Sequence, residues 1–141
     1  MLFLDRGTWP QSLQGAFVHV KHAADSGHRK IVVKTVDTDV VVLAISLFQS
    51  LQIEELWVEF GVGKQLRWLP IHEYVTNLGE SVCKGLRFWF AFTGCDTVSS
   101  FAGRGKKYSW TVWRSHPDVN ETFERYALVF HLCKKYKNII L

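Results

Sequence analysis

The amino-acid sequence predicts an α/β domain built on a parallel sheet. Residues 31–36 are rich in β-branched residues and, apart from Lys34, nearly continuous in apolar residues, which is typical of a strand buried in a parallel sheet. Residues 40–51 indicate a buried helix, although their valines also permit a strand, and residues 55–60 indicate a second strand. Strand, helix, strand and then several helices are the order expected of an α/β domain.

The remaining elements follow from apolar periodicity and from glycine and proline. Residues 13–24 predict a helix, and residues 65–69 predict a short hairpin arm beside the second strand. Further helices are predicted over residues 70–77, 80–92, 106–114 and 119–136, with a turn over 100–105. We expect a single domain over residues 1–141, with the α/β core over 11–97 and a helical nucleic-acid-binding part over 98–141.

Composition restricts the class of protein only loosely. The chain has 141 residues, 48% of them hydrophobic and 14% aromatic, enough for a ring-rich core. Its net charge of +4 favours a polyanionic partner, but weakly. The widely spaced cysteines Cys83, Cys95 and Cys133 suggest reduced thiols in an intracellular protein. No apolar run is long enough to span a bilayer, and the first ten residues do not resemble a signal peptide, so we expect no membrane partner.

Two acidic turns are the most informative feature. Asp37 and Asp39 follow the strand of residues 31–36, and Asp96 follows the apolar residues 88–92. Parallel sheets bind ligands at the carboxyl ends of their strands, where Asp37 and Asp39 are expected. Such carboxylates can hold a divalent metal. The plainer alternative is a turn or helix-capping role, with Asp39 capping the next helix.

A second group of residues suggests phosphate binding. It consists of Gly103, Arg104, Gly105, Lys106 and Lys107. The glycines let the backbone approach a phosphate, the following helix presents its N-terminal N–H groups, and the cations add charge. The alternative is a solvated basic turn.

Other polar and aromatic residues are expected to be structural. The histidines His19, His22, His72 and His131 have no convincing metal-ligand spacing, and we expect them at or near the surface. The aromatic residues of 88–92 are expected in the core, and Trp110 and Trp113 are expected on one inward helix face.

In order and spacing, these motifs resemble the flap-endonuclease-like branch of the PIN-like nucleases. Residues 19–113, roughly two-thirds of the chain, resemble still more closely an uncharacterised group of animal proteins found around mobile elements. The motifs that carry the resemblance are Val36-Asp37-Thr38-Asp39, Leu78-Gly79-Glu80, Thr93-Gly94-Cys95-Asp96 and the Gly103–Lys107 turn.

The resemblance implies a PIN-like, Rossmann-like fold and a catalytic site for phosphodiester hydrolysis. Asp37, Asp39 and Asp96 would be the catalytic residues and the ligands of Mg²⁺ or Mn²⁺, with a metal-activated water as nucleophile. The Gly103–Lys107 turn would bind the nucleic-acid backbone, and the expected partner is DNA. A nuclear location follows from that partner alone.

The sequence also departs from the resembling family. Residues 9–14 contain no carboxylate where the family has acidic residues, and we expect the family's earlier strand, with its own aspartate, to be absent. The chain is therefore expected to be incomplete at its N-terminus, with an exposed sheet edge. The predicted function is a partial or degenerate structure-specific nuclease-like domain that binds nucleic-acid backbone, whether or not it still cuts.

Two other functions are compatible with the same residues. One is a metal-free module that binds nucleic acid or protein. The other is a haloacid-dehalogenase-like phosphatase, with Asp37 as nucleophile and Asp39 as acid and base. The chain lacks the Gly-Thr that usually follows the second aspartate of such phosphatases.

Overall fold

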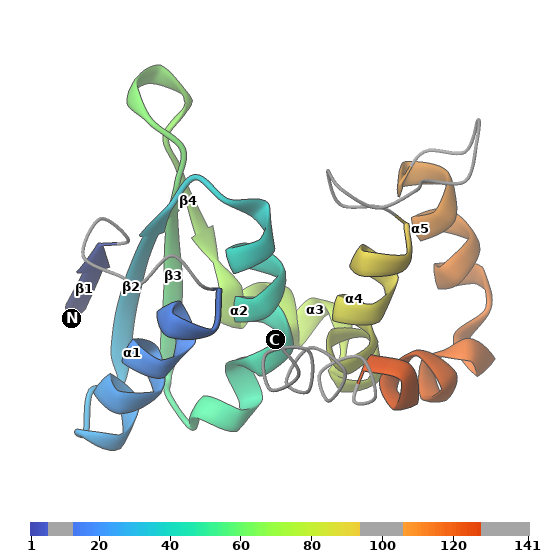
Figure 1. Cartoon of the computed structure of the whole chain (residues 1–141), viewed down its shortest axis with the longest axis horizontal. Coiled ribbons are helices and arrows are strands. Elements are labelled where there is room, and N and C mark those ends of the chain that lie inside the picture. Colours follow the sequence, from blue (N-terminus) through green and yellow to red (C-terminus); the bar gives the residue numbers. More distant parts are fainter. Residues whose placement is uncertain (6–12, 94–105, 128–141) are drawn as a thin grey trace, which may run out of the picture. The chain divides into compact units, whose positions relative to one another are not determined.

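The computed structural model describes residues 1–5, 13–93 and 106–127 of the chain. They belong to two compact units, Met1–Gly79 and Glu80–Leu141. The first unit is α/β and the second is helical (Figure 1). The predicted turn over residues 100–105, and the predicted helix beyond residue 127, lie outside the described residues.

The first unit contains a four-stranded, mostly parallel sheet. Its strands are β1 (Leu2–Asp5), β2 (Lys30–Thr35), β3 (Glu55–Phe60) and β4 (Arg67–Pro70). They lie side by side in chain order. The first three strands run parallel, and β4 runs antiparallel to β3. The predicted α/β class, both predicted strands and the hairpin arm are confirmed.

Strand β1 corrects the expectation that no strand precedes the first helix. Leu2 pairs with Ile31 and Asp5 pairs with Lys34, so β2 has a neighbour on each side. The outermost strand on this side of the sheet is therefore β1, and its last residue is an aspartate, Asp5. Four residues are too few to show a period, and hydrogen bonding to β2 makes this segment a strand.

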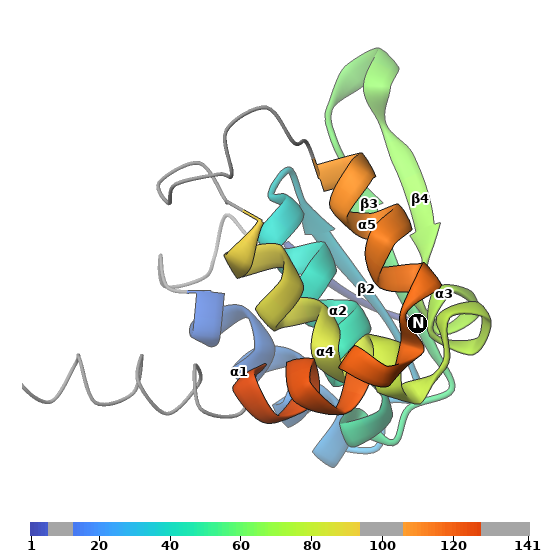
Figure 2. The same ribbon diagram turned by 90° about the vertical axis from the view of Figure 1, so that its right-hand side faces the viewer.

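Helices connect the parallel strands. The connections are α1 (Leu13–Asp25) before β2 and α2 (Thr38–Leu51) before β3, and α3 (Ile71–Leu78) follows β4. Because such crossovers are almost always right-handed, strands in the order 1-2-3 place α1 and α2 on the same face of the sheet (Figure 2). All three helices were predicted within two residues of these bounds. Among the described residues, no helix has the length and apolar character that crossing a membrane requires.

The two faces of the sheet differ in character. On the helix-covered face Ile31, Val33, Leu56 and Val58 are buried. They form the core together with buried residues of α1 and α2, which include Val20, Val40 and Ala44. On the other face Lys30 pairs with Glu55, and Lys34 pairs with Glu59 at 3.4 Å. The hydrogen bond from Lys30 lowers the pKa of the Glu55 carboxyl below its usual value. Ion pairs of this kind suit a surface in contact with water.

The second unit is a helical cluster around aromatic rings. Its elements are α4 (Glu80–Phe92), α5 (Lys106–Ser115), the short 3₁₀ helix η3 (Pro117–Val119) and a helix over residues 120–127. The Trp89 ring contacts those of Trp110 and Trp113, at centroid distances of 5.1 and 5.8 Å. The prediction that Trp110 and Trp113 pack inward on one helix face is therefore confirmed.

Gly61 shapes the connection between β3 and β4. Its φ is +96°, and a Cβ atom there would lie 2.7 Å from the backbone oxygen of Gln65. Gly63 has a φ of +54°, but a Cβ atom there would meet nothing within 4 Å. Positive φ disfavours any residue with a side chain, and the clash adds to that cost only at Gly61.

We expect Gly61→Ala to destabilise the α/β unit by about 2 kcal/mol or more, and Gly63→Ala by about 1 kcal/mol. Urea unfolding of the two variants measures the difference. Equal losses of stability would mean that the hairpin shifts to accommodate the extra methyl group at residue 61.

Candidate site at the carboxyl edge of the sheet

Asp37 occupies the junction between β2 and α2. Its backbone is extended, with φ −104° and ψ 120°, and its side chain caps the helix. The Asp39 N–H donates to Asp37 Oδ1 at 3.2 Å, and the Asp37 N–H donates to the Thr35 hydroxyl at 3.1 Å. The prediction that Asp39 caps this helix is wrong. The helix begins at Thr38, two residues earlier than predicted, so Asp37 is the cap and Asp39 lies in the first turn.

Asp37 and Asp39 both lie at the start of α2. A carboxylate has about four acceptor positions, and the capping hydrogen bond occupies one of those of Asp37. Asp37 and Asp39 are both half-buried, so each side chain still reaches the surface. The junction can therefore present two carboxylates to a bound cation.

Asp5 is a candidate that sequence reasoning missed. It ends β1 and pairs with Lys34, one residue before the end of β2. Because β1 and β2 are parallel, Asp5 and Asp37 stand at the same edge of the sheet. The available signal was the apolar run 2–4 followed by an aspartate, which repeats on a smaller scale the run 31–36 followed by Asp37.

The rest of the predicted site is only partly described. Asp96 lies outside the described residues, as do Gly103, Arg104 and Gly105. Among the side chains that the structure describes, which do not include those of Asp5 and Asp96, no group of three or more His, Cys, Asp or Glu residues could hold a metal ion. The structure thus brings together Asp37 and Asp39 and adds Asp5 at the same edge.

Lys106 and Lys107 begin α5 in the helical unit. The Lys106 ammonium lies 3.7 Å from the centroid of the Phe90 ring, a cation–π contact that tethers this charge to α4. Lys107 is exposed. Two cations at this position can contact phosphate, although the positive end of the helix dipole opposes their placement there.

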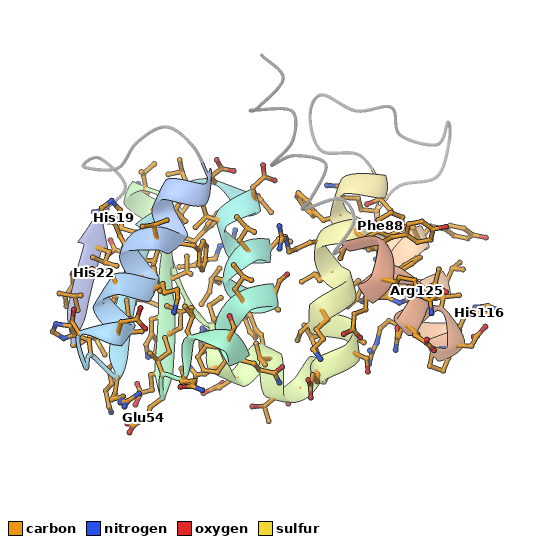
Figure 3. The ribbon with its side chains drawn as sticks, turned by 60° about the horizontal axis from the view of Figure 1, so that its bottom comes forward. His19, His22, Glu54, Phe88, His116 and Arg125 are labelled. Atoms are coloured by element: carbon orange, nitrogen blue, oxygen red, sulfur yellow. The ribbon has the colours of Figure 1, made fainter. Side chains whose placement is uncertain are left out.

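The described histidines lie in two kinds of environment. His19 and His22 are exposed on the outer side of α1 (Figure 3). His72 lies on α3, with Nδ1 3.2 Å from the Leu56 carbonyl oxygen and its ring 5.2 Å from that of Trp57. These contacts give His72 a role in packing α3 against β3. His131 lies outside the described residues.

Cys83 is the cysteine that the structure describes. It is buried in α4, and burial raises the pKa of its thiol. A raised pKa keeps the side chain in the unreactive thiol form, as expected for a structural cysteine. Cys95 and Cys133 lie outside the described residues.

Comparison with known proteins adds no identification. No protein-family model matches the chain, and neither the curated proteins nor the solved structures contain a match to it. The class that the fold and the site define is therefore an α/β unit with aspartates at the carboxyl edge of a mostly parallel sheet, followed in the chain by a helical unit.

Proposed function

We propose that this chain is a PIN-like, flap-endonuclease-like domain that hydrolyses phosphodiester bonds of nucleic acid with the help of Mg²⁺ or Mn²⁺. One observation carries the proposal: two neighbouring parallel strands, β1 and β2, each lead into an aspartate at the same edge of the sheet. In this proposal Asp5 corresponds to the aspartate of the family's earlier strand. The expected absence of that aspartate was one reason for predicting a degenerate domain. The order of motifs in the sequence supports the same proposal.

The donor set fits a hard divalent cation. Asp5, Asp37 and Asp39 offer only carboxylate oxygen, the ligand that Mg²⁺ and Mn²⁺ prefer. In this proposal these residues hold the metal, and Asp96 is a further ligand. A bound metal of this type lowers the pKa of a coordinated water and offsets negative charge on the reacting phosphate.

The protein's own part in the reaction is binding and orientation. The capping hydrogen bond from the Asp39 N–H to Asp37 holds that carboxylate at a set position, so little ordering is needed when a cation binds. Gly103–Lys107 would hold the nucleic-acid backbone by contacts that do not depend on base sequence. Cleavage would not depend on base sequence, because none of these groups reads a base.

A metal-free binding module is the second candidate. The capping role of Asp37 favours it, because that role alone accounts for an acidic residue at the start of α2. In this case the basic residues would still bind a nucleic-acid backbone, and the aspartates would serve only the fold. Metal dependence separates the two candidates.

The deciding experiment is a Mn²⁺ and Mg²⁺ titration of the purified chain with a fluorescent branched DNA, with an EDTA control. Anisotropy follows binding and gel electrophoresis follows cleavage. We expect cleavage that requires metal and that stops in EDTA. Binding without cleavage at any metal concentration would select the metal-free module. Hydrolysis of a phosphate monoester, with DNA left intact, would select the phosphatase.

A further inference from the structure

The hairpin between β3 and β4 projects beyond the sheet (Figure 1). Residues 62–68 are all exposed, and the short 3₁₀ helix η2 (Gly63–Gln65) forms the tip. The turn is ordered by backbone hydrogen bonds, from Gln65 to the Val62 carbonyl at 3.1 Å and from Leu66 to the Gly63 carbonyl at 3.3 Å. Gly61 fixes its base, as described above. These hydrogen bonds give the projecting hairpin a defined conformation.

The composition of the hairpin is unusual for a solvated loop. Val62 is 68% exposed, Leu66 is 39% exposed and Trp68 is 47% exposed, so three large apolar side chains face water. Lys64 and Arg67 lie between them, and residues 60–68 contain no acidic residue. Basic side chains beside an exposed aromatic ring are a combination that binds single-stranded nucleic acid, the cations through phosphates and the ring through a base face.

The hairpin begins at the same edge of the sheet as the carboxylates. Thr35 and Phe60 are partners in neighbouring parallel strands, and the Gly61 N–H donates to the Thr35 carbonyl at 3.1 Å. Asp37 stands two residues beyond Thr35, and Val62 stands two residues beyond Phe60. Neighbouring strands lie about 4.8 Å apart, so the hairpin leaves the sheet next to the start of α2.

Two contacts bear on the charged and aromatic groups of the hairpin. The Arg67 guanidinium lies 5.8 Å from the Phe60 ring centroid, which orders the arginine while leaving it exposed. Trp68 pairs across the strands with Glu59, whose carboxylate is itself paired with Lys34. The negative charge of Glu59, opposite Trp68, is therefore compensated by Lys34. The hairpin presents net positive charge to an approaching nucleic-acid strand.

We propose that the hairpin of residues 60–68 is a binding element for single-stranded nucleic acid. Lys64 and Arg67 contact phosphates, and Trp68 stacks on a base. This assignment rests on the proposed function and deepens it. It places the single-stranded portion of a branched substrate next to the aspartates, at the carboxyl end of β3. Positive charge selects a polyanion over an uncharged apolar partner, and the exposed ring selects unpaired bases over a duplex.

The test is binding of the full chain to a fluorescein-labelled oligothymidylate of about 16 nucleotides, a length within known single-strand site sizes. EDTA is present throughout, so cleavage cannot interfere. We expect Lys64→Gln with Arg67→Gln to weaken binding about tenfold and to reduce the slope of log K against log salt by about 1.4, as expected for two phosphate contacts on a single strand. Trp68→Ala should weaken binding about tenfold as well.

Matched variants control for charge and for exposed aromatic area. Lys21→Gln with Arg29→Gln removes the same charge from exposed positions in α1 and before β2. Phe3→Ala removes an aromatic side chain that is 62% exposed on β1. Both controls should bind within about twofold of the original chain, and thermal unfolding should confirm that every variant is folded. If Trp68→Ala fails to fold, Lys64→Glu at the hairpin tip replaces it and should weaken binding more than Lys64→Gln.

The outcomes separate this proposal from the proposed function. Binding that the hairpin variants weaken, in a chain that never cleaves DNA with Mn²⁺, would support the hairpin and reject the nuclease. Metal-dependent cleavage with hairpin variants that bind as tightly as the controls would reject the hairpin alone. No binding of the oligothymidylate by the original chain would also overturn the hairpin proposal.

Discussion

Asp37→Asn is expected to abolish metal-dependent cleavage of DNA while leaving the fold intact. Asparagine is as good a helix N-cap as aspartate, so the hydrogen bond from the Asp39 N–H survives the change. The substitution removes the negative charge that a divalent cation needs. Loss of several kcal/mol of metal-dependent stabilisation corresponds to at least about a hundredfold in rate.

Two other variants show whether the effect arises from the charge or from the cap. Asp37→Ala removes both, and it should cost about 1 kcal/mol of stability in addition to the loss of cleavage. Asp25→Asn removes a carboxylate from the exposed end of α1, where it pairs with Lys21 at 3.3 Å. It should retain activity and stability, since exposed pairs of this kind contribute little.

The measurements are single-turnover cleavage, Mn²⁺ binding by calorimetry and urea unfolding on the same samples. Full cleavage by Asp37→Asn would remove Asp37 from the ligand set and leave it as a helix cap. Loss of cleavage with unchanged Mn²⁺ affinity would also remove it from the ligands, and would point to a positioning role through α2.

Trp113→Ala is expected to have the largest effect on stability. Trp113 is 3% exposed, and its ring lies 5.8 Å from that of Trp89 and 5.1 Å from that of Phe123. Its Nε1–H donates to Asn120 Oδ1 at 2.7 Å. Truncation leaves a large cavity among the rings and leaves the Asn120 side chain without this hydrogen bond. We expect it to lower the free energy of unfolding by about 3–5 kcal/mol.

Urea unfolding monitored by circular dichroism measures this loss. Trp113→Phe should lie between the original chain and Trp113→Ala, because it keeps a ring but loses the hydrogen bond to Asn120. Val112→Ala, at the neighbouring position that is 41% exposed, serves as the control and should cost well under 1 kcal/mol. A loss in Trp113→Ala no greater than in this control would show that the aromatic cluster does not stabilise the helical unit.

Much of the fold is readable from local pattern. Strand β3 and helix α4 have the bounds that periodicity predicts, because each apolar run is bounded by a residue that breaks it. Gly61 follows β3 with a φ of +96°, and Gly79 precedes α4 with a φ of +85°. Glycine adopts these conformations without the steric cost that other residues incur, so the local sequence predicts where each element begins or ends.

The candidate site is readable only in part. Asp37 and Asp39 follow an apolar run long enough to predict a strand, so their position at a strand end was expected and is found. Which of the two aspartates caps the helix was not predicted. Whether a helix begins at residue 38 or 40 depends on where β2 stops pairing with β3. That pairing joins residues 25 apart, and no local window contains both partners.

The sequence by itself determined the α/β class, the order of the helices and the presence of acidic residues after the central strand, since these follow from periods and breakers within short segments. Only the tertiary structure decided that residues 2–5 are a strand, that Asp5 stands at the same edge as Asp37, and that the 62–68 hairpin leaves the sheet beside them. The physical reason is register: hydrogen bonds between strands that are distant in the chain set which residues become neighbours, and those bonds form only when the sheet assembles.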